Sequence, residues 1–108
     1  MSNYTRTFAG LTAAFTIKAS DHIDFAFSKS HQISWTKNGG TTGTLAVQVK
    51  PAGTDRFENL TVGGVAVSLS LAADGTFGPF DGMFTEIKVT PSGFDGTNFA
   101  VTFSGWGE

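Results

Sequence analysis

The chain has 108 residues, of which 40% are hydrophobic and only 15% are charged, and its formal net charge is −2. This length fits one domain with one core, and the slightly acidic balance excludes the basic patch that nucleic-acid-binding proteins use against phosphates. Cysteine is absent, which excludes disulfides and thiol chemistry, and the sequence pattern predicts neither a signal peptide nor a membrane-spanning helix.

The chain predicts a single domain over residues 1–108, in which residues 1–10 are a possible N-terminal arm. The stretch Phe8 to Ala14 is the one helical candidate, but it is short and contains Gly10 and the β-branched Thr12. We therefore interpret Phe8 to Ala14 as part of an arm or as an edge strand.

Period-two alternation of apolar and polar residues dominates the rest of the chain, and Gly or Pro clusters separate the alternating runs. Such runs predict half-buried antiparallel strands. Their apolar faces comprise Ala13, Phe15 and Ile17; Ile23, Phe25 and Phe27; Ile33 and Trp35; Leu45, Val47 and Val49; Val65, Val67, Leu69 and Leu71; Ile87 and Val89; and Phe99, Val101 and Phe103. The spacing predicts an all-β, antiparallel β-sandwich of about 7–8 strands, either a jelly roll or an immunoglobulin-like sandwich.

Three Asp-Gly pairs, Asp74-Gly75, Asp81-Gly82 and Asp95-Gly96, mark the last third of the chain. Asp-Gly between alternating runs is a hairpin signal, because Gly accepts positive φ and Asp bonds its own backbone. We predict tight hairpin turns at these pairs and a loop over residues 74–82.

Candidate metal ligands gather most densely at Asp21, His22, Asp24 and His31. A metal site needs these side chains to converge, whereas Asp21, His22 and His31 lie where turns enter or leave predicted strands, so we interpret them as turn residues. The Asp residues of the Asp-Gly pairs lack the spacing of an EF-hand. We expect no metal and no cofactor.

Catalytic motifs give no support for an enzyme. The chain has two His residues and no Gly-x-Ser-x-Gly elbow, so a serine triad has no basis in the sequence. Nothing singles out a pair of carboxylates for acid–base work. We predict a protein without catalytic residues.

Phenylalanine is unusually abundant, with 11 copies. Those on alternating apolar faces are expected in the core, whereas Phe77, Phe80, Phe84 and Phe94 lie in or beside Gly-rich loops. Phe80 and Phe94 can either cap the open ends of a sandwich or bind a partner. Trp106 falls on the polar face of the last predicted strand, and we expect that strand to lie at an edge, where pairing with a partner is favoured.

Two segments resemble strands of small tailed-phage virion proteins: Gly43-Thr44-Leu45-Ala46-Val47-Gln48-Val49-Lys50, and the C-terminal stretch from Asp95 to Gly105. The strand Glu86-Ile87-Lys88-Val89-Thr90 lies between them, in the order typical of those proteins. The segment from Pro51 to Phe57 departs from the pattern, in which Asn-Asp-Gly and a Trp often follow. The resemblance implies a β-sandwich virion protein without catalytic residues, either a head decoration (cement) protein or a tail or neck component. It would be made in the host cytoplasm and located in the virion.

The sequence therefore predicts a non-enzymatic structural component of a bacteriophage particle, most simply a capsid decoration protein that stabilises the shell through arm and edge-strand contacts. The expected partners are further copies in a homo-oligomer and other virion proteins such as the major capsid protein, with no nucleic acid and no membrane. The predicted contact residues are Tyr4, Arg6, Phe8, Phe80, Phe94 and Trp106.

Two alternatives remain open. One is a tail or neck structural protein. The other is a carbohydrate-binding, lectin-like or host-receptor-binding module, which would present Trp35, Phe80, Phe94 or Trp106 as an exposed platform for sugar rings.

Overall fold

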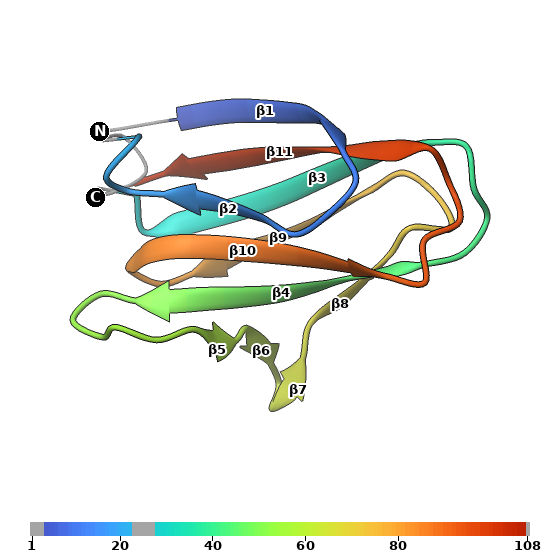
Figure 1. Cartoon of the computed structure of the whole chain (residues 1–108). Coiled ribbons are helices and arrows are strands. Elements are labelled where there is room, and N and C mark those ends of the chain that lie inside the picture. Colours follow the sequence, from blue (N-terminus) through green and yellow to red (C-terminus); the bar gives the residue numbers. More distant parts are fainter. Residues whose placement is uncertain (1–3, 23–27, 108) are drawn as a thin grey trace.

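The computed structural model describes residues 4–22 and 28–107 (Figure 1). The predicted strand formed by Ile23, Phe25 and Phe27 lies outside the described residues. The strands are β1 (Tyr4–Leu11), β2 (Phe15–Lys18), β3 (Ser30–Asn38), β4 (Thr44–Pro51), β5 (Glu58–Asn59), β6 (Thr61–Val62), β7 (Val65–Ala66), β8 (Ser68–Ser70), β9 (Gly75–Asp81), β10 (Phe84–Ser92) and β11 (Asn98–Trp106).

Two antiparallel sheets form the sandwich, and a small ribbon stands apart from them. Sheet A has the strand order β1-β11-β3-β9, and sheet B has the order β2-β10-β4-β5, with β8 also paired to β4. Strands β6 and β7 pair only with each other and project away from both sheets (Figure 1). The described chain is thus all-β, as the alternation predicts.

The route of the chain between the sheets identifies the topology. The connections β1–β2, β2–β3, β3–β4, β8–β9, β9–β10 and β10–β11 all cross from one sheet to the other. An immunoglobulin-like sandwich joins several neighbouring strands within one sheet. Here only the segment from β4 to β8 stays on one side, which is the double Greek-key path of a jelly roll.

The core lies between the sheets and draws its side chains from both. Alternate residues of the central strands are buried, for example Phe99, Val101 and Phe103 on β11, and Leu45, Val47 and Val49 on β4. Each such strand therefore turns one face to the core and the other outward. The period-two patterns over these strands are confirmed.

The Asp-Gly pairs turn out to lie at corners between sheets, and the prediction of hairpin turns there is wrong. Asp74-Gly75 leads from β8 in sheet B to β9 in sheet A, Asp81-Gly82 leads back to β10, and Asp95-Gly96 leads to β11. Gly75 and Gly96 lack the positive φ on which the hairpin prediction rested. The hairpin in which Gly supplies both turn residues is β6–β7, where Gly63 and Gly64 have φ of 61° and 82°.

Residues 75–81 form strand β9, so the predicted loop over residues 74–82 is also wrong. β9 pairs with β3 at the edge of sheet A, and the register shifts between the pairs His31–Phe80 and Ile33–Phe77. Gly78 and Pro79 occupy this irregular part. An edge strand tolerates Pro because one side of its backbone has no neighbouring strand.

The strand that contains Trp106 lies inside sheet A, where we expected an edge. β11 pairs with β1 on one side and β3 on the other. Of the two alternatives for the N-terminal part, an arm or an edge strand, the edge strand is the one observed: Tyr4–Leu11 forms β1, paired along β11 with an irregularity between Phe8 and Leu11. The outer neighbour that β11 needs is thus provided by the N-terminal part of the same chain.

Candidate functional site

The outer face of sheet A is almost without charge, and we call it the hydroxyl face. Side chains alternate between the core and this face along β11 and β3 and along the regular parts of β1 and β9. The residues on its outward positions are Thr5 and Thr7 of β1; Asn98, Ala100, Thr102, Ser104 and Trp106 of β11; Ser30, Gln32, Ser34, Thr36 and Asn38 of β3; and Thr76 and Asp81 of β9. Asp81, at the end of β9, is the one charged residue in this set.

The two basic residues of sheet A fall on the alternate, inward-directed positions of their strands. Arg6 lies at the edge and donates to the Thr5 carbonyl at 3.0 Å, while Lys37 donates from Nζ to the Gly40 carbonyl at 2.7 Å. The carboxylate of Asp81 accepts a 2.7 Å hydrogen bond from the Ser30 hydroxyl. The centre of the hydroxyl face therefore presents hydroxyl, amide and methyl groups alone.

Hydroxyl pairs join neighbouring strands across this face. The Oγ1 atoms of Thr7 and Thr102 lie 2.9 Å apart, and Ser34 Oγ lies 3.1 Å from Thr76 Oγ1. Such cross-strand pairs stabilise the sheet modestly. They also use part of the hydrogen-bonding capacity of these side chains, which lowers the cost of covering the face.

A shallow hollow of about 190 Å³ lies in the middle of the hydroxyl face. The small side chain of Ala100 leaves space between its longer neighbours on the three adjoining strands. The hollow is lined by Thr7, Ser34, Trp35, Thr36, Ala100 and Thr102. None of these residues carries a charge, so the hollow suits an apolar or neutral group.

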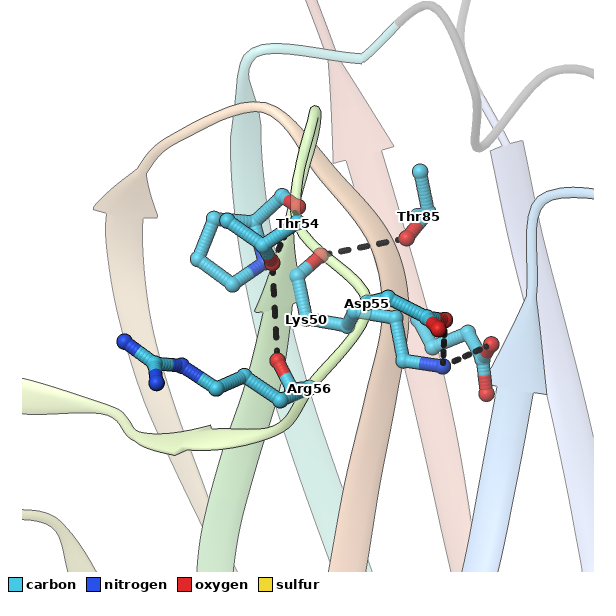
Figure 2. A network of polar contacts seen from close by, with 7 residues as sticks. Lys50, Thr54, Asp55, Arg56 and Thr85 are labelled. Atoms are coloured by element: carbon cyan, nitrogen blue, oxygen red, sulfur yellow. Dashed lines mark hydrogen bonds and ion pairs between the residues drawn. The ribbon is translucent and has the colours of Figure 1, made fainter.

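The outer face of sheet B is charged and internally paired. Glu86 of β10 lies between Lys50 of β4 and Lys18 of β2 in the register, and Lys50 Nζ is 2.9 Å from the Glu86 carboxylate. Figure 2 shows Lys50 close to Asp55, at 4.0 Å. The ammonium groups of Lys50 and Lys88 also lie 5.0 and 4.7 Å from the centroid of the Phe57 ring. This face has the character of an ordinary solvated surface.

A buried polar pair lies beneath the hydroxyl face at one end of the sandwich. His31 Nε2 donates to the Gly82 carbonyl at 3.0 Å, so that Nδ1 accepts from the Tyr4 hydroxyl at 3.2 Å. Burial lowers the pKa of His31, partly offset by the Gly82 bond and by Asp81, and burial raises the pKa of Tyr4. His31 is thus a neutral core residue, and its interpretation as a turn residue is wrong.

Most of the predicted contact residues have internal roles in the structure. Tyr4 and Phe80 are buried; the ring of Phe80 lies 5.6 Å from that of His31. Phe8 and Phe94 are partly buried against the core, with ring centroids 4.3 Å from Phe15 and 5.9 Å from Phe99 respectively.

Trp106 keeps an exposed fraction of 36% and belongs to the hydroxyl face. Its role as a contact residue stays a prediction, now at the margin of a face instead of along a sheet edge. The same holds for Arg6, which lies beside this face on the edge strand β1.

The three Asp residues of the Asp-Gly pairs hold the corners of the sandwich. Asp74 accepts from the Lys37 amide, and Asp95 accepts from the amides of Thr41 and Thr42 at 2.8 and 2.9 Å. The amides of Thr42 and Thr41 hold the pKa of Asp95 below its usual range. Asp74 and Asp81 lie at opposite ends of β9, so the three carboxylates do not converge.

Within the described ranges, no group of three or more potential metal ligands is found. A second cavity of about 240 Å³ lies at the β10–β11 corner and is lined by Thr12, Pro91, Ser92, Gly93, Phe94, Gly96 and Thr97, without a titratable side chain. Among residues 4–22 and 28–107, no helix is long and apolar enough to cross a membrane.

The platform required for sugar stacking is not formed by the aromatic residues that sequence reasoning proposed. Trp35 is buried and its indole nitrogen donates to the carbonyls of Ser70 and Ala73, both at 2.9 Å. Phe80 is buried as well, and Phe94 is partly so. Trp106 alone among the four has its ring at an exposed position.

Sequence reasoning missed the hydroxyl face and the β6–β7 ribbon. The signal for the face is present in the polar halves of the alternating runs, since Thr5-x-Thr7, Ser34-x-Thr36 and Thr102-x-Ser104 each repeat hydroxyl residues with period two. Which of these runs are neighbours depends on the strand order, which the sequence does not display. The face could therefore not be assembled from local patterns.

No protein-family model and no curated protein sequence matches the chain. Among solved structures, the SPBc2 prophage-derived protein YomS is similar, with a TM-score of 0.60, 9% identity and coverage of 97% of this chain and 95% of that one. A Bacillus endospore appendage protein and a Yersinia pseudotuberculosis-derived mitogen give TM-scores of 0.44 and 0.43, with 12% and 10% identity. The match to the appendage protein covers 95% of this chain and 83% of that chain, and the match to the mitogen covers 99% of this chain and 86% of that chain. At such identities the likeness to the prophage protein shows a shared fold and leaves function to be argued from the surface.

Proposed function

We propose that this protein is a non-enzymatic structural component of a bacteriophage particle, a capsid decoration protein that contacts its neighbours through the hydroxyl face. The observation that carries the proposal is the near absence of charge across the described part of this face, on which Asp81 at the end of β9 is the one charged residue. Solvated surfaces are usually rich in interspersed charges, whereas the covered centres of interfaces are depleted of them.

Two further features support this function. The jelly roll is a recurrent fold of viral capsid proteins, although it is also found in lectins and cupins. The fold is shared with a prophage-derived protein. The resemblance of the strands Gly43–Lys50 and Asp95–Gly105 to those of phage virion proteins is consistent with both features.

The size of the face predicts a weak contact that becomes effective on an assembled surface. Four strands about 4.8 Å apart, with about eight residues each at ~3.3 Å per residue, cover roughly 500 Å². A standard stable interface buries about 800 Å² on each partner. Repeated weak contacts on a shell add by avidity, and a protein that binds only the assembled state stabilises that state.

The test is the composition of purified particles. We expect the protein in particles purified by density gradient from the organism that carries its gene, in a fixed ratio to the major capsid protein. Separation of heads from tails then distinguishes a decoration protein from a tail or neck component. Absence from purified particles would refute a virion role of either kind.

A carbohydrate-binding function has one observation in its favour. The partly exposed ring of Phe94 lines the corner cavity together with the hydroxyl residues Thr12, Ser92 and Thr97. A glycan array would detect such binding, and replacement of Phe94 by Ala should then abolish it. No binding on the array would leave the structural role as the remaining function.

A further inference from the structure

The β6–β7 ribbon carries an exposed apolar tip. Val62 and Val65 are directly opposite each other in the register, so both side chains point to the same side. Their exposed fractions are 54% and 68%. We call this pair the valine tip. Two exposed valines next to each other form a small apolar patch at the end of a projecting hairpin, and covering it would remove apolar surface from water.

The base of the ribbon is fixed, whereas its tip is free of the sandwich. Leu60 and Val67 are buried on either side of the ribbon, the Leu60 amide donates to the Val47 carbonyl at 3.0 Å, and the Val67 amide donates to the Leu60 carbonyl at 2.8 Å. An isolated two-stranded hairpin is at best marginally stable in water. These anchors hold the valine tip in a defined position away from both sheets (Figure 1).

The hollow of the hydroxyl face matches the valine tip in size and polarity. Its volume of about 190 Å³ corresponds to about six water-sized groups at ~30 Å³ each. Two valine side chains contribute six carbon atoms beyond Cα. No charged residue lines the hollow, and none occurs in the chain from Asn59 to Ala73, so neither side would lose the hydration of a charge.

We propose that the valine tip of one copy docks into the hollow of the hydroxyl face of a second copy. This inference rests on the proposed function, because it names the partner of the face. The ribbon joins strands of sheet B, whereas the hollow lies on the outside of sheet A, so one molecule cannot fill its own hollow. The two surfaces differ, so the contact is heterologous and joins molecules head to tail.

A mixing experiment tests this geometry, because a heterologous contact has two separable halves. Val62→Ser with Val65→Ser removes the tip and keeps the hollow, while Ala100→Lys blocks the hollow and keeps the tip. Neither variant should self-associate. Ala46→Lys is the matched control, since Ala46 is also an outward Ala on a central strand, but of sheet B.

The readout is the set of amide chemical shifts in a ¹⁵N-labelled variant at about 1 mM, where contacts with millimolar Kd are detected. Labelled tip variant mixed with unlabelled Ala100→Lys should show shifts around Thr7, Ser34 and Thr102. With the labels exchanged, the shifts should move to residues 61–66. The chemical shifts of each variant alone should not depend on protein concentration, whereas those of the wild type and of Ala46→Lys should. The Kd of self-association of the wild type and of Ala46→Lys should be at least about ten-fold lower than that of either variant.

Three outcomes would overturn the inference. The first is that mixing the two variants produces no chemical-shift changes. The second is that the tip variant self-associates like the wild type. The third is that the chemical shifts of the wild type do not depend on protein concentration. The second outcome would indicate that two hydroxyl faces meet directly and would leave the proposed function intact. The third would remove self-association altogether, and the particle analysis above would then decide the virion role independently.

Discussion

The two outer faces of the sandwich are built from the same kind of strand but differ in charge. On sheet B, Lys50 pairs with Glu86, and the ammonium groups of Lys50 and Lys88 lie 5.0 and 4.7 Å from the centroid of the Phe57 ring. On sheet A, hydroxyl groups pair with each other, and the one charged residue among the outward positions is Asp81 at the end of β9. Because folding requires only that one side of each strand be apolar, the outward sides of the two sheets are free to differ, and the proposed function accounts for the difference by a contact on sheet A.

The interiors beneath the two faces also differ. The described core residues of sheet B are aliphatic, such as Ile17, Val47 and Ile87, whereas sheet A covers the hydrogen-bonded pair of Tyr4 and His31. A buried imidazole makes the stability of this end depend on pH. Substitutions on the outer face and in the core of each sheet therefore test how the two sheets differ.

The largest expected effect concerns His31. Replacement by Leu removes the bonds to Tyr4 and to the Gly82 carbonyl and should lower the free energy of unfolding by about 2–4 kcal/mol. Because burial lowers the pKa of His31 in the folded state, the unfolded state binds more protons as the pH falls below about 6.5. Wild-type stability should therefore be complete above pH 6.5 and decrease below it, and His31→Leu should reduce this slope.

Chemical denaturation at a series of pH values measures this effect. His22→Asn removes the other imidazole and so separates its contribution to the slope from that of His31. The neighbouring titratable groups are Tyr4 and Asp81, so Asp81→Asn should alter the slope only slightly. A wild-type slope that survives in His31→Leu would assign the pH dependence to another group.

A somewhat smaller effect is expected at Gly105 of β11. A methyl group at this position would collide with the ring of Tyr4. Gly105→Ala should therefore cost about 1–3 kcal/mol of stability through overpacking, whereas Ser104→Ala, one residue away on the hydroxyl face, should cost within about 0.5 kcal/mol. Thermal or chemical unfolding gives both values. Equal costs at the two positions would show that Tyr4 moves aside easily.

The ion pair on sheet B should contribute less. Side-chain exposures of 18% for Lys50 and 21% for Glu86 leave the pair partly screened by solvent. Glu86→Gln should lower stability by about 0.2–1 kcal/mol, and the loss should shrink at high salt. Glu58→Gln, an exposed position on the same sheet, is the control and should have almost no effect. A loss that is independent of salt would indicate packing of the Glu86 side chain instead of its charge.

The smallest effect is expected when a charge is added to either face of the monomer. Ala100→Lys and Ala46→Lys should each change the free energy of unfolding by less than about 0.5 kcal/mol when measured at low protein concentration. Such a result would show that folding does not require an uncharged hydroxyl face. If Ala100→Lys alone is strongly destabilised, the lack of charge serves the fold and the assembly argument loses its basis.

Much of the fold was predictable, because strand alternation is a local property. The runs around Leu45, Ile87 and Phe99 gave the correct buried residues, and their polar partners gave the correct outward ones. Strand β9 was missed because Gly78 and Pro79 disfavour a strand unless it lies at an edge. The run from Val65 to Leu71 was predicted as one strand but divides into β7 and β8, so that Val65 is exposed while Val67 is buried.

The candidate surface was less predictable, because it depends on which strands become neighbours. The Asp-Gly pairs looked like hairpin turns until the strand order placed them at crossings between the sheets, where Gly75 and Gly96 have no positive φ. Tyr4 looked like part of an arm until β1 paired with β11. His31 looked like a turn residue until Tyr4, Phe80 and Phe84 surrounded it.

The amino-acid sequence by itself determined that this protein is an all-β domain with few charges, since side-chain period and composition are properties of short segments. Only the tertiary structure decided that the chain crosses between sheets at six connections and brings the hydroxyl residues of β1, β11, β3 and β9 onto one surface. The physical reason is that sheet order is set by long-range burial and pairing, which residues distant in the chain satisfy together.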